Sequence, residues 1–142
     1  LIARQSGSLW GQALAETHLG LLAVAQDRFG RAHVHFASAL TLYRRFGSDI
    51  YLAWCLEGVA ALCSIEGDYT RTVAISAGAE VLRAKGHAPR PAGEQQAFER
   101  VLATCSEALG EETYQRAWEA GAAAPREPLI QLALGEDDTL TR

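Results

Sequence analysis

The histidines and clustered carboxylates are the residues of this sequence best suited to bind a metal or to transfer a proton. His33 and His35 are two positions apart in an expected helix, so their side chains point about 200° away from each other and cannot share one ion. His18 is accompanied by no nucleophile motif. Residues 111–112 lie at an expected helix start, where the helix dipole favours negative charge, and residues 136–138 lie in the C-terminal tail. We therefore predict no catalytic residue, no metal site and no cofactor.

The three cysteines are expected to be buried, unpaired thiols. Cys55 and Cys63 lie eight residues apart on one expected helix, roughly 12 Å along its axis, which exceeds the roughly 7 Å Cα separation that a disulfide allows. The sequence also lacks a glycine-rich phosphate loop, a nucleophile elbow and a Cys-x-x-Cys pair. These features predict a cytoplasmic protein that is not an enzyme.

Composition indicates one soluble domain. Of the 142 residues, 49% are apolar and 21% are charged, which is enough apolar residue for a buried core. The net charge is −4 and the arginines are scattered, so direct nucleic-acid binding is not expected. No apolar stretch is long enough to span a membrane.

Helix formers dominate, β-branched residues are few, and glycine, proline and aspartate divide the chain into an all-α arrangement of six to seven helices. The helices are expected at 9–26, 30–46, 49–66, 69–85, 93–109, 111–122 and 127–134. Because the chain begins at Leu1 and contains no methionine, we expect it to be a piece of a longer protein.

An internal repeat organises these helices. Phe29-Gly-Arg-Ala32 is matched forty residues later by Tyr69-Thr-Arg-Thr72 and again at Tyr114 to Ala117, and Gly20 aligns with Gly58 in the preceding helices. A glycine inside a helix costs about 1 kcal/mol relative to alanine, so its recurrence predicts close helix approach. The expected structural positions are Gly20, Phe29, Ala32, Phe36, Ala39, Gly58, Tyr69, Tyr114 and Ala117, with the aromatic residues Phe29, Tyr69 and Tyr114 expected in the core. We predict a single domain over 1–142: repeat 1 at 8–46, repeat 2 at 49–86, a degenerate third helical pair at 92–124, a capping helix at 126–135 and a tail at 136–142.

The first unit resembles the tetratricopeptide repeat family, through Leu19-Gly20, Phe29, Ala32, Phe36 and Ala39 in the order and spacing of that family's consensus. This resemblance implies helical hairpins stacked into an α-α superhelix. From Gly67 to Leu134 the chain is similar to the C-terminal end of bacterial signal-transduction ATPases and LuxR-type transcriptional regulators, through Gly67-Asp-Tyr69, Pro89-Arg-Pro91, Leu109-Gly-Glu-Glu112 and Ala117-Trp-Glu-Ala-Gly121. That similarity implies a regulatory module that binds a protein or peptide, or another domain of its own parent chain.

The apolar first helices predict where such a partner would bind. The concave-face positions that the resemblance implies are Leu14, Thr17, Leu21, Leu52, Cys55 and Val59. If the groove is open, this apolar patch is a site for a helix or peptide, and if it is filled, the same residues are core. A small-molecule sensor with a pocket lined by residues such as Trp54 and Cys55 is the alternative function. We also expect self-association through the apolar N-terminal edge at Leu9-Trp10.

Overall fold

The structure, a computed structural model, describes residues 2–142, with side chains from residue 8 onward. These residues form seven α-helices, one short 3-10 helix and no strand, which confirms the predicted all-α class and helix count. The helices are α1 (Ile2–Ala25), α2 (Phe29–Tyr43), α3 (Asp49–Ile65), α4 (Tyr69–Lys85), α5 (Ala92–Leu109), α6 (Glu111–Ala123) and α7 (Arg126–Leu134), and the 3-10 helix η1 is Thr139–Thr141.

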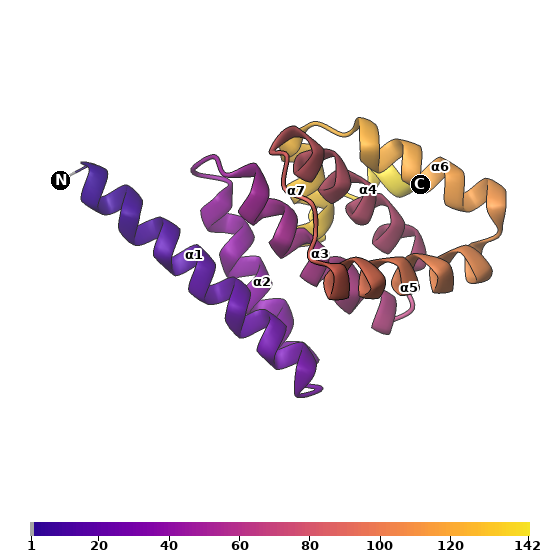
Figure 1. The fold of residues 1–142 in the computed structure, drawn as a ribbon, viewed down its shortest axis with the longest axis horizontal. Helices are drawn as coiled ribbons and strands as arrows, with labels where there is room; N and C mark the ends of the chain where they lie inside the picture. The colour runs from indigo at the N-terminus through magenta and orange to yellow at the C-terminus, as the bar shows by residue number, and fades with distance from the viewer. Residues whose placement is uncertain (1) are drawn as a thin grey trace.

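Two helical hairpins form the first part of the molecule. Helix α1 packs along α2, and α3 packs along α4, each pair joined by a short turn (Figure 1). Asp27 in the first turn and Gly67 in the second have positive φ angles of 57° and 84°, which let the chain reverse direction within a few residues. The second hairpin lies beside the first, through contacts of α3 with both α1 and α2.

Two helix boundaries differ by three or more residues from those expected, and the others agree to within one residue. Helix α1 starts at Ile2 instead of residue 9, because no residue of the N-terminal segment forces a break, and it extends beyond the end of α2 (Figure 1). Helix α2 ends at Tyr43 instead of residue 46. Arg126 from α7 donates hydrogen bonds to the carbonyl oxygens of Tyr43 and Phe46, at 2.7 and 3.0 Å, so these carbonyls are satisfied without another helical turn.

The last three helices are arranged differently from a third hairpin. Helix α5 contacts α3 and α4, while α6 packs chiefly along α4 and only lightly against α5. A side chain on Gly121 would collide with the main chain of Ala74, so only glycine permits this close crossing of α4 and α6. Helix α7 then packs against α2, α3 and α4.

The core of the two hairpins is built around Phe36. A Cβ atom placed on Gly20 would lie 2.5 Å from the Phe36 ring, and one placed on Gly58 would lie 2.8 Å from it. The ring therefore occupies space that both glycines leave open, and the predicted close approach at Gly20 and Gly58 is present in the structure.

Other repeat positions divide between the core and its edge. The small residues Ala32, Ala39 and Ala117 are buried. Phe29, Tyr69 and Tyr114 are only partly buried and pack against the edges of the two apolar clusters, so their expected place in the core is wrong. An aromatic in the first turn of a helix covers the end of the neighbouring helix, where solvent still reaches one side of the ring.

Among the described helices, none combines the length and the apolar character that crossing a membrane would require.

Candidate binding groove between α1, α3 and α5

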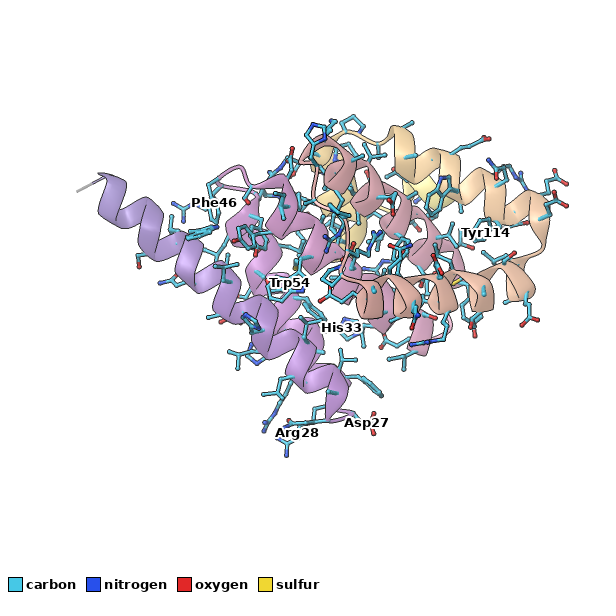
Figure 2. The ribbon with its side chains drawn as sticks, in the orientation of Figure 1. Asp27, Arg28, His33, Phe46, Trp54 and Tyr114 are labelled. Atoms are coloured by element: carbon cyan, nitrogen blue, oxygen red, sulfur yellow. The ribbon has the colours of Figure 1, made fainter. Side chains whose placement is uncertain are left out.

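An apolar groove of about 250 Å³ lies where α1, α3 and α5 meet. Leu21 of α1 forms one wall, and Trp54, Gly58 and Ala61 of α3 form the floor; Figure 2 labels Trp54 on α3. Ala60 of α3 and Ala97, Phe98 and Val101 of α5 complete the apolar lining. Because Ala97 is exposed, the groove is open to solvent along α5.

One end of the groove is closed by a cluster of buried charges. The Glu57 carboxylate accepts two hydrogen bonds from Arg83, with Nε at 2.6 Å and Nη2 at 2.8 Å, and a third from Nε of Arg90 at 2.7 Å. Arg90 also donates from Nη1 to Glu80 at 2.6 Å, and its guanidinium carbon lies 3.5 Å from the centre of the Phe98 ring. The cluster therefore ties the 86–91 linker to α3, α4 and α5.

Burial makes these charge pairs mutually dependent. The side chains of Arg83 and Arg90 are 8% and 2% exposed, and that of Glu57 is 15% exposed. The hydrogen bonds that Arg83 donates to the Glu57 carboxylate raise the pKa of Arg83 above its ordinary value, which keeps the guanidinium charged despite burial. Glu57 is thus the common counter-ion of two buried cations.

Four of the six predicted groove residues are not available to a partner. Thr17, Leu52 and Cys55 are fully buried and Val59 is 3% exposed, so at these positions the groove is filled and the residues belong to the core. Thr17 donates to the carbonyl oxygen of Ala13 and lies 3.3 Å from the hydroxyl of Tyr43, which satisfies its polar atom inside the core.

The other two predicted groove residues are half-buried, and only Leu21 borders the groove that the structure describes. On α3 the open face runs through Trp54, Gly58 and Ala61, one position away from the predicted face through Cys55 and Val59. A shift of one residue turns a helix face by about 100°, which exchanges a solvent-facing stripe for a buried one.

The cysteines are buried and unpaired, as expected from their spacing. Burial raises the pKa of Cys55 to about 12 and that of Cys63 to about 11, and it also raises the pKa of Cys105. Because a thiol reacts through its thiolate, these side chains are inert at neutral pH. Of the two residues expected to line a ligand pocket, Trp54 borders the groove, whereas Cys55 is buried in the core.

The histidines singled out in the sequence contact separate parts of the molecule. His33 pairs with Glu66 at 2.8 Å, and Nδ1 of His35 pairs with Glu16 at 2.7 Å. His18 packs edge to face against Trp54, with ring centres 4.7 Å apart. Over the side chains that the structure describes, no three His, Cys, Asp or Glu residues come together as potential metal ligands.

Sequence reasoning missed the polar end of the groove, although two signals pointed to it. Glu57 is the one charged residue of α3 beyond its first turn, in a largely apolar stretch, so its burial required a cationic partner. Arg90 lies between two prolines in the linker, where the restricted backbone holds the side chain in one direction. Neither signal shows on its own that the two residues meet, because 33 positions separate them.

Comparisons of this chain with models of known protein families, with curated proteins and with solved structures found no match.

Proposed function

We propose that this chain is a non-catalytic binding module that recognises an apolar segment of a protein partner through the groove between α1, α3 and α5. The single observation that carries the proposal is the groove itself, with walls from three separate helices, an apolar lining and an exposed edge along α5. Apolar surface that remains accessible beside a packed core is typical of sites for partners.

The size of the groove favours a side chain of a larger partner over an enclosed ligand. Pockets for whole small molecules commonly measure about 300–1,000 Å³, whereas this groove measures about 250 Å³. It therefore suits one or two apolar side chains presented by a helix or an extended segment.

The setting we propose is regulatory and cytoplasmic. The resemblance of the sequence to tetratricopeptide regions of bacterial signalling ATPases and LuxR-type transcription regulators supports a module that acts by binding, and three buried free thiols suit a reducing compartment. The partner is then a separate protein or another domain of the parent chain, with no role for direct contact with nucleic acid or membrane.

A groove-filling variant tests this proposal. Peptides selected from a random phage-displayed library on the wild-type chain should bind the Ala97→Trp variant at least tenfold more weakly in fluorescence polarisation, because the indole would occupy the open edge of the groove. Ala103→Trp is the matched control, since Ala103 is an exposed position of the same helix outside the groove. Equal binding to Ala97→Trp and wild type would show that the groove is not the site.

Small-molecule sensing is the second candidate function, and the aromatic side chains that border the groove favour it. Trp54 on α3 and Phe98 on α5 both border the groove and present flat surfaces suited to a small aromatic ligand. Under this alternative, native mass spectrometry of the purified chain should detect a bound mass that disappears on denaturation and is absent from Ala97→Trp.

A further inference from the structure

The charges around the groove do not balance. Arg83 and Arg90 supply two positive charges, while Glu57, Glu80 and Glu94 supply three negative ones. Glu57 is shared by both arginines and Glu80 is paired with Arg90, so these four groups neutralise one another. The remaining negative charge belongs to Glu94.

Glu94 lies at the exposed edge of the groove, where it would contact a bound partner. It lies in the first turn of α5, is exposed, and borders the same groove as Trp54 and Phe98. Within the part of the chain whose side chains are described, it forms no ion pair, although it is close enough to contribute to the raised pKa of Arg83. The exposed mouth of the groove thus has one carboxylate without an ion-pair partner among the described side chains.

Arg90 does not offset this charge for a partner. Its guanidinium group is engaged by two carboxylates, and one face is covered by the Phe98 ring. With the side chain 2% exposed, Arg90 has little surface left to attract an acidic group.

We infer that the groove selects a peptide segment in which an apolar anchor residue is followed closely by a lysine or arginine. The anchor enters between Trp54 and Phe98, and the basic side chain reaches Glu94 at the mouth. An acidic residue at the same place is disfavoured by repulsion from Glu94. This inference rests on the proposed function, because it specifies the partner of the same groove.

Charge-matched probes test the inference. Peptides selected from the random phage library on the wild-type chain are expected to be enriched in an apolar residue with a neighbouring Lys or Arg. For one such peptide, replacing the basic residue by glutamine should weaken binding about two- to fivefold, the range expected of an exposed ion pair. The Glu94→Gln chain should bind the two peptides equally, and the difference for the wild-type chain should shrink at high salt.

Matched variants distinguish a failure of this inference from a failure of the proposed function. Glu107→Gln alters another exposed carboxylate of α5 outside the groove and should keep the wild-type preference for the basic peptide. Peptides that are blocked by Ala97→Trp but show no basic preference would overturn the inference and leave the proposed function standing. Peptides that bind Ala97→Trp as well as wild type would overturn both.

Discussion

At the scale of single residues, the Glu57 carboxylate is the most consequential polar group in the molecule. It accepts hydrogen bonds from two arginines whose side chains are almost completely buried. A buried cation that loses its counter-ion cannot recover its hydration, so removing one partner costs far more than the pair itself contributes. The cluster therefore holds the linker in place as long as Glu57 is charged.

Replacing Glu57 by glutamine should lower the free energy of unfolding by about 3–5 kcal/mol, because Arg83 would remain buried without a carboxylate partner and Arg90 would keep only Glu80. The measurement is chemical denaturation followed by circular dichroism. Glu80→Gln is the matched control, since the Glu80 side chain is 45% exposed and its loss should cost less than about 1 kcal/mol. Similar losses from the two substitutions would contradict the counter-ion role of Glu57.

At the scale of helices, glycines decide which elements can approach each other. Gly20 and Gly58 admit the ring of Phe36, Gly78 admits the side chain of Leu129 from α7, and Gly121 lies against the main chain of Ala74. A flexible side chain can move to accept a methyl group, but a helix backbone cannot. The crossing of α4 and α6 is therefore the least tolerant of these contacts.

Gly121→Ala should destabilise the protein by about 3 kcal/mol, at the upper end of overpacking costs, because the added methyl meets backbone atoms. Gly11→Ala is the opposite case. Gly11 is in the middle of α1 with nothing near its missing side chain, so alanine should stabilise by about 0.5–1 kcal/mol. Thermal unfolding of both variants measures the contrast, and an unchanged midpoint for Gly121→Ala would argue against the close crossing.

The helices were largely predictable from the sequence, whereas the groove was not. Turn residues such as Gly67 and Gly110 act locally, so they mark helix ends without knowledge of the fold. Which α3 residues line the groove depends on the rotation of α3 about its own axis, which is set by distant contacts such as Phe36 against Gly58. Because α3 is apolar on nearly every side, its sequence does not distinguish Trp54 from Cys55 as the accessible residue.

At the scale of the whole molecule, the α1–α2 hairpin presents apolar side chains to solvent. Leu19 and Leu22 on α1 are 42% and 52% exposed, and Val34 on α2 is 67% exposed. Trp10, at the edge named in the sequence, is 40% exposed but packs against Tyr51 with ring centres 5.3 Å apart. The exposed apolar surface of the hairpin thus continues from the Leu9-Trp10 edge along Leu19, Leu22 and Val34.

We predict that the chain self-associates through this surface, with an apparent mass that rises with concentration in sedimentation velocity. The double variant Leu22→Glu/Val34→Glu should remain monomeric, because charges would have to be buried in the contact. Ile65→Glu makes the same type of change at a residue that is 54% exposed at the end of α3, and it should still associate. A wild-type chain that stays monomeric at every concentration would refute the prediction.

The hydrogen bonds at the two ends of α7 have a consequence for how the chain folds. Arg126 binds carbonyl oxygens at the end of α2, and Arg71 binds those of Leu132 and Ala133 at the other end of α7, across more than 60 positions of sequence. Contacts between segments so far apart form late, after the entropy of closing a long loop has been overcome. During synthesis, the contacts of the first hairpin with α7 must therefore wait until residues 126–134 have left the ribosome. The molecule should consequently fold as one cooperative unit, unlike an array of repeats that can add one after another.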